Sequence, residues 1–220
     1  MGRWLASTIG RKQIIGLTGL GLSLFVLSHM LGNMLILAGP KAYNEYSHAL
    51  ISNPLIYAAE VGLIVIFVVH LGLALLLQIK NRGARDSRYA VMSNGPKGTS
   101  WTQRTLLAQG LVILVFVILH LVTFKYGTHY TADYGKGEIR DLHRLVIEVF
   151  NEPGYVIWYV VALVVLGLHL WHGVASVFQT FGAYHPRYQP TIKAISFGYA
   201  AFVMFGFLSQ PLYVYFIHRG

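Results

Sequence analysis

Four histidines, His29, His70, His120 and His169, lie within separate apolar segments that are each long enough to cross a lipid bilayer. An ionisable side chain in hydrocarbon is costly, and those found there are retained for a function such as ligand binding or proton transfer. Imidazole is also the commonest protein ligand for metal ions. One histidine on each of four spans therefore indicates metal centres held between helices.

The segments that must position these histidines are transmembrane helices. Hydrophobic residues make up 55% of the 220-residue chain and charged residues only 11%. Backbone groups in a bilayer must bond within their own segment, which makes each long apolar run a helix. We predict an all-α integral membrane protein, a single domain over residues 1–220, with five transmembrane helices at about 13–37, 54–80, 104–126, 154–179 and 191–217. The first run is too long for a signal peptide and lacks a small-x-small cleavage pattern, so we keep it as a helix.

The absence of cysteine limits the cofactors that the chain can hold. It excludes disulfides, thiolate-ligated iron-sulfur clusters and covalent haem attachment through a C-x-x-C-H motif. No glycine-rich nucleotide-binding loop follows a strand, and we expect no nucleic-acid partner. Any redox cofactor must therefore be held by histidine.

Basic residues divide the connections into two sides. One side carries Arg3, Arg11, Lys12, Lys80, Arg82, Arg85, Arg88, Lys97, Arg104, Arg187 and Lys193. The other carries Lys41, Lys125, Lys136, Arg140, Arg144 and Arg219. By the positive-inside rule the first side, with the N-terminus, faces the cytoplasm. The connection from Lys80 to Arg104 is either a docking surface for a partner or only a topology signal that also meets anionic lipid.

Depth along the helices groups the histidines into pairs. His29 and His120 each lie sixteen residues beyond the inner end of an outward-running helix, which places both roughly 24 Å above that end. His70 and His169 each lie ten residues before the inner end of an inward-running helix, roughly 15 Å above it. We therefore expect an outer pair, His29 with His120, and an inner pair, His70 with His169.

Two pairs at equal depth are what bis-histidine ligation of two b-type haems requires. Small residues near the ligands are compatible with the approach of a flat macrocycle, although glycine is also common at ordinary helix contacts: Gly32, Gly72, Gly167, Gly173 and Ser176. Chlorophyll or a di-metal site would also use histidine, but di-metal sites normally add carboxylates, and none accompanies these four. The remaining alternative is that each imidazole only bonds across a helix interface.

Two further ionisable residues lie on the helices. His172 is three residues after His169 on one helical face; depth favours His169 as the ligand, and His172 is then placed to contact a haem propionate or a quinone. Glu60, roughly 9 Å below the outer start of its helix, is the only carboxylate predicted inside a span. It is either a proton carrier for quinone chemistry or an interfacial residue that reaches water.

These residues resemble the membrane cytochrome b subunit of succinate:quinone oxidoreductases, which include succinate dehydrogenases and fumarate reductases, of the single-subunit, five-helix, two-haem type. The resemblance covers nearly the whole chain. It is carried by Ser28-His29-Met30 with Gly32-Asn33, by Tyr57-Ala58-Ala59-Glu60 leading to His70, by Leu119-His120-Leu121, and most specifically by the stretch from His169 to Gly182.

The resemblance implies His29 and His120 as ligands of the haem distal from the soluble subunits, and His70 and His169 as ligands of the proximal one. It also implies a bacterial inner membrane, an iron-sulfur subunit and a flavoprotein subunit as partners, and a quinone, menaquinone or ubiquinone, as substrate. The dicarboxylate site would lie on the flavoprotein and not on this chain. Some relatives carry a glutamate near the fourth-helix ligand for proton transfer, whereas here Gly167 and Leu170 leave that neighbourhood without an acid. The alternatives are a cytochrome subunit of another quinone-linked complex, such as a hydrogenase or formate dehydrogenase, and a haem-free transporter or scaffold with a histidine proton path.

Overall fold

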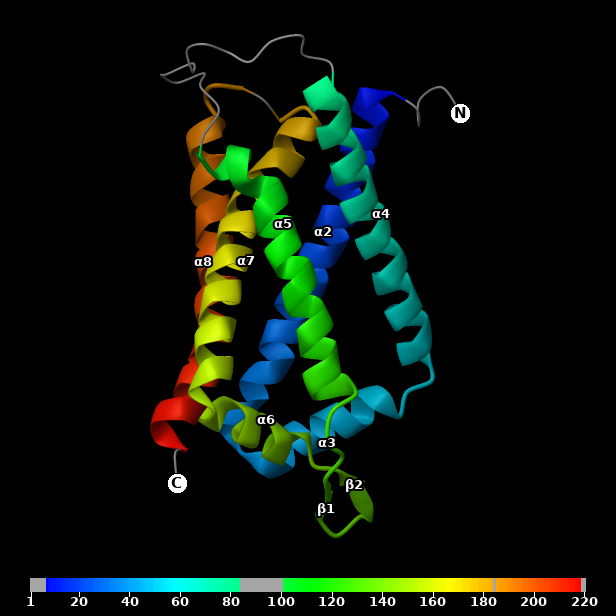
Figure 1. Ribbon diagram of the computed structural model, residues 1–220, viewed down its shortest axis with the longest axis vertical. Coiled ribbons are helices and arrows are strands. Elements are labelled where there is room, and N and C mark those ends of the chain that lie inside the picture. The colour runs from blue at the N-terminus through cyan, green and yellow to red at the C-terminus, as the bar shows by residue number, and fades with distance from the viewer. Residues whose placement is uncertain (1–6, 84–100, 184, 219–220) are drawn as a thin grey trace.

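The computed structural model describes residues 7–83, 101–183 and 185–218 (Figure 1). Within these residues five helices are long and apolar enough to cross a membrane: Thr8–Ala38, Leu55–Asn81, Arg104–Lys125, Pro153–Thr180 and Gln189–Ile217. The prediction of an all-α membrane protein with five spans is confirmed.

The first span changes its helix type before it ends. Helix α2 (Thr8–Asn33) begins five residues earlier than predicted because the Ser7 side chain accepts a hydrogen bond of 3.0 Å from the Gly10 N–H and caps it. The last turn tightens into the 3₁₀ helix η1 (Met34–Ala38). Gly39 then turns the chain with a φ of 99°, a conformation that glycine adopts readily.

The other spans are α4 (Leu55–Gly83), α5 (Trp101–His120) with its π-helical extension η2 (Leu121–Lys125), α7 (Pro153–Thr180) and α8 (Gln189–Ile217). Helices α7 and α8 form the most closely packed pair, and α2 and α5 lie against α7. Helix α4 lies at one edge of the bundle, mainly against α2 (Figure 1), and none of its described side chains is buried.

One end of the bundle carries a small cap, built from segments that the sequence analysis assigned to loops between the spans. It consists of α3 (Pro40–Ile51), the antiparallel hairpin of β1 (Thr131–Asp133) and β2 (Glu138–Arg140), in which Ala132 is opposite Ile139, and α6 (Leu142–Asn151). Asn44, fully buried, joins these pieces. Its amide donates to Asp141 at 2.7 Å and to Tyr134 at 3.0 Å, and its oxygen accepts the His143 N–H at 2.9 Å.

Successive connections between the spans lie at alternating ends of the bundle (Figure 1), as expected for helices that each cross the membrane once. The start of α2, the end of α4 and the turn between α7 and α8 lie at one end of the molecule, and the cap and the end of α8 lie at the other (Figure 1). Arg85, Arg88 and Lys97 of the expected docking loop lie outside the described residues, as does Arg3.

Candidate functional site

The outer histidines, His29 on α2 and His120 at the end of α5, lie side by side. Their ring centroids are 5.8 Å apart and their planes are nearly perpendicular, at 89°. Aromatic rings surround them: Phe25 stacks on His29 at 5.3 Å, and Phe124 lies 5.3 Å from His120. The rings make an apolar, close-packed enclosure for two imidazoles.

Hydrogen bonds hold both members of the outer pair. The Tyr159 hydroxyl lies 3.1 Å from Nδ1 of His120. On the other side, the Asn33 amide donates to the His29 backbone carbonyl at 2.8 Å, and Tyr43 of the cap donates to Asn33 Oδ1 at 2.8 Å. Burial raises the pKa of Tyr43 well above its ordinary value, so this phenol stays neutral as a donor. The cap is thereby connected to the helix turn that carries His29.

The inner histidines, His70 on α4 and His169 on α7, also lie side by side, with ring centroids 6.4 Å apart and planes at 74°. Nδ1 of His70 is 3.1 Å from the Ile15 carbonyl oxygen and 3.2 Å from the Thr18 hydroxyl. Nδ1 of His169 is buried and has no hydrogen-bond partner within residues 7–83, 101–183 and 185–218. The four rings thus meet in the same two pairs that the depth calculation indicates.

The centroid distance within each pair is compatible with one shared metal ion. Two metal–imidazole bonds of about 2 Å, together with half of each ring, span roughly 6 Å, and the observed centroid distances are 5.8 and 6.4 Å. Where a ring Nδ1–H donates to an oxygen, as Ile15 and Tyr159 permit, Nε2 keeps its lone pair for a metal.

Each pair brings together two imidazoles as possible metal ligands. Among the residues that the structure describes, no group of three or more His, Cys, Asp or Glu side chains could hold a metal ion. Two imidazoles alone leave a zinc or copper ion short of protein ligands. A haem would bring four nitrogen ligands of its own and would need only two imidazoles from the protein, so the residues present fit it.

The glycines near the ligands divide into two groups according to what an added Cβ would meet. A Cβ on Gly32 would lie 2.5 Å from the Tyr46 hydroxyl, and one on Gly167 would lie 2.8 Å from the Met204 sulfur. These two glycines therefore allow close packing within the protein. At Gly72 and Gly173 an added Cβ would have no atom of the described residues within 4 Å. Gly173 is one helical turn from His169 on the same face, where a planar group would need room.

His172 lies beside the inner pair but takes a different partner. Its Nε2 is 3.0 Å from the Ser176 hydroxyl, while the ring contact with His70 is made by His169.

Of the other histidines, His48, His129, His185 and His218 are exposed, and His143 is half-buried in the cap. Burial lowers the pKa of His143, the nearby Asp141 carboxylate opposes this effect, and His218 adds to it.

Glu60 forms an ion pair with Lys125, which joins the first turns of α4 to η2. Both side chains are more than one-third exposed, at 38% and 39%. The two residues are 65 positions apart in the sequence, and the only signal for the pair was that both were assigned to the outer side. The structure therefore gives Glu60 a charged partner that sequence reasoning did not identify.

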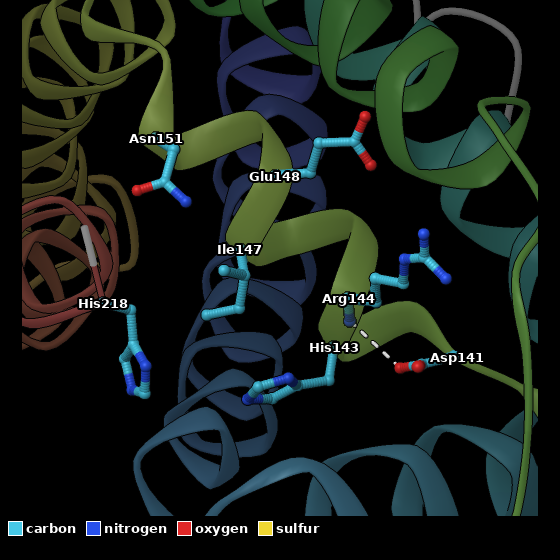
Figure 2. A pocket seen from close by; sticks show the side chains of 7 residues that line it. All are labelled: Asp141, His143, Arg144, Ile147, Glu148, Asn151 and His218. Carbon is cyan, nitrogen blue, oxygen red and sulfur yellow. Dashed lines mark hydrogen bonds between the residues drawn. The ribbon is translucent and has the colours of Figure 1, made fainter. Parts of the chain in front are cut away.

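The cap carries an open depression of about 580 Å³ lined by Asp141, His143, Arg144, Ile147, Glu148, Asn151 and His218 (Figure 2). Its side chains come from α6 and the end of α8, and none of the four span histidines contributes to it. It lies on the surface of the cap and does not belong to the histidine pairs.

Comparisons of the chain with protein-family models, with curated proteins and with solved structures give no match.

Proposed function

We propose that this chain is a dihaem b-type cytochrome, the membrane-anchor subunit of a succinate dehydrogenase or fumarate reductase. The observation that supports it most strongly is the meeting of His29 with His120 and of His70 with His169 inside a five-span bundle. Each pair would hold one haem b through its two imidazoles. Bound haem supplies reversible one-electron transfer, and the protein supplies position and surroundings.

The chain's own residues orient the ligands and exclude water. Phe25 and Phe124 flank the outer imidazoles, and the Ile15 carbonyl oxygen is placed to fix the His70 ring. Such partners of ligating histidines set the ring tautomer and raise its basicity. His172, bonded to Ser176, is placed beside the inner pair, where a haem propionate or a quinone could meet it.

The partners follow from the family resemblance. In this proposal the side that carries the N-terminus faces the cytoplasm of a bacterial inner membrane and docks an iron-sulfur subunit, which in turn binds a flavoprotein with the dicarboxylate site. Electrons pass between that iron-sulfur subunit and a membrane menaquinone or ubiquinone. Reducing one quinone takes two electrons and two protons, and Glu60 at the outer end of α4 is the candidate proton carrier.

The experiment that tests this function uses the chain as expressed in its own host, purified with whatever subunits accompany it. We expect a reduced-minus-oxidised spectrum with b-type bands, and quinone-linked succinate oxidation or fumarate reduction by the copurified complex. A b-type spectrum with hydrogenase or formate dehydrogenase activity in place of dicarboxylate activity would favour the other quinone-linked complexes. A chain without haem would favour the transporter or scaffold alternative and overturn the proposal.

A further inference from the structure

One buried side chain beside His120 could change the ligand strength of this histidine without affecting the inner pair. Tyr159, on α7, is 6% exposed. Its ring packs at 4.9 Å against both Phe116 and Phe150, while its hydroxyl reaches Nδ1 of His120 at 3.1 Å. The phenol is therefore held in place by aromatic packing on α5 and α6, with its oxygen directed at one ring nitrogen.

The backbone at His120 is also unusual. The α-helical pattern of α5 ends at this residue and continues as the π-helix η2, in which the Tyr126 N–H bonds to the Leu121 carbonyl at 3.0 Å. Arg140 of the cap donates to the Phe124 carbonyl at 2.8 Å, so this carbonyl at the wide turn is satisfied. Single π-helical turns occur frequently at functional sites, where they re-aim side chains. The π-helical turn and the bond from Arg140 therefore set the backbone that immediately follows His120.

We propose that Tyr159 is a positioning residue for the outer pair, acting by accepting a hydrogen bond from Nδ1 of His120. That bond selects the tautomer with its lone pair on Nε2, fixes the ring plane and strengthens Nε2 as a donor to the metal. The inference rests on the proposed function, because it assigns a role to Tyr159 only if the outer pair ligates haem iron.

The inner pair shows why this role can be tested at Tyr159. Nδ1 of His70 faces the backbone carbonyl of Ile15, which no substitution removes, with the Thr18 hydroxyl beside it. At the outer pair the corresponding partner is a side chain, and Tyr159→Phe deletes one oxygen while keeping the ring that packs against Phe116 and Phe150. The two sites therefore differ in the feature that tunes ligand strength, and only the outer one changes in this variant.

The experiment compares Tyr159→Phe with the parent chain, using haem content, the midpoint potentials of both haems in a redox titration, and low-spin electron paramagnetic resonance spectra. The outer haem is identified as the one that His29→Ala removes. Loss of the bond weakens the imidazole as a donor to ferric iron. We expect the outer potential to rise, the outer haem to bind about tenfold more weakly, its resonance signal to shift, and the inner haem to stay unchanged.

Tyr155→Phe is the matched control, because Tyr155 lies one turn earlier on α7 and is 41% exposed. It should behave as the parent. A Tyr159→Phe chain whose two potentials and two resonance signals equal those of the parent would overturn the inference. So would the loss of both haems together, which would indicate a general packing role. Replacement of Tyr159 by 3-fluorotyrosine, which keeps the shape but weakens the oxygen as an acceptor, should raise the outer potential by a smaller amount. A parent chain without haem would instead refute the proposed function.

Discussion

Nδ1 of His70 lies 3.1 Å from the carbonyl oxygen of Ile15, across the contact between α4 and α2. The same carbonyl also accepts a hydrogen bond of 3.1 Å from the Thr18 hydroxyl. Because none of the described side chains of α4 is buried, this polar contact places His70 more firmly than packing alone would. The close approach depends on Gly19, where an added Cβ would lie 3.0 Å from Cε1 of His70.

We therefore predict that Gly19→Leu displaces the His70 ring and weakens haem binding at the inner site by about tenfold or more. Helix propensity works in the opposite direction, since glycine is roughly 0.8–1 kcal/mol less favourable than alanine in a helix interior and leucine ranks close to alanine. The haem content of the purified chain, titrated with added haem, measures the effect. Gly62→Leu on α4, where an added Cβ meets nothing within 4 Å, is the control. Normal haem affinity at the inner site in Gly19→Leu would show that the His70 ring does not depend on close contact with Gly19.

The second prediction concerns Glu60. If its carboxylate carries a proton for the quinone reaction, Glu60→Gln should slow quinone-linked turnover by about 100-fold, a typical loss when a proton-transfer group is removed. Both haems should still bind. Activity with a dye that bypasses quinone should stay near the parent level, because the catalytic subunits are untouched.

The Glu60–Lys125 ion pair supplies the discriminating variant. Lys125→Gln removes the pair but leaves the carboxylate. If Glu60 is a proton carrier, quinone-linked turnover should survive in this variant. Equal losses in Glu60→Gln and Lys125→Gln would mean that the pair only ties α4 to η2. Full activity in Glu60→Gln would assign the residue to the membrane interface.

The third prediction concerns the cap at acidic pH. Burial lowers the pKa of His143 from its ordinary value of 6.5, so the folded cap favours the neutral ring. Below pH 6.5 the unfolded cap takes up this proton before the folded one does, and the stability that the neutral ring contributes is lost as the pH falls further. Hydrogen exchange of α6 amides should therefore accelerate, beyond its intrinsic pH dependence, between pH 7 and pH 5.

In His143→Gln this acceleration should be smaller, whereas His129→Gln, an exposed position before β1, should leave it unchanged. If the exchange of α6 amides accelerated equally in the parent and in His143→Gln, the acceleration would not arise from His143.

The five spans could be predicted from sequence because run length and hydropathy decide them. The grouping of His29 with His120 could be inferred because a helix advances by a constant rise per residue. The cap could not be predicted, because α3 and α6 are short helices of mixed composition within segments that have the sequence character of loops. Asn44, which joins the cap, gives no sequence signal because its bonds to Tyr134 and Asp141 join residues 90 and 97 positions away.

The partners of the ligands were missed for the same reason. Tyr159 lies 39 positions from His120 and stands in an apolar run where tyrosine is ordinary. The roles of Gly32 and Gly167 could not be decided from the sequence, because a glycine that admits a macrocycle and one that admits a neighbouring side chain look identical there. Only the contacts with Tyr46 and Met204 distinguish them.

The haem stoichiometry of the purified chain and its histidine variants, measured by the pyridine haemochrome assay, tests whether the four span histidines ligate two haems. We predict two haems b per parent chain, with His29→Ala and His120→Ala each removing the same one, and His70→Ala and His169→Ala each removing the other, because each iron needs both imidazoles. His172→Ala should retain both; loss of the inner haem in His172→Ala but not in His169→Ala would make His172 the ligand. A parent chain with no haem, or a variant lacking all four span histidines that still binds two, would contradict the account.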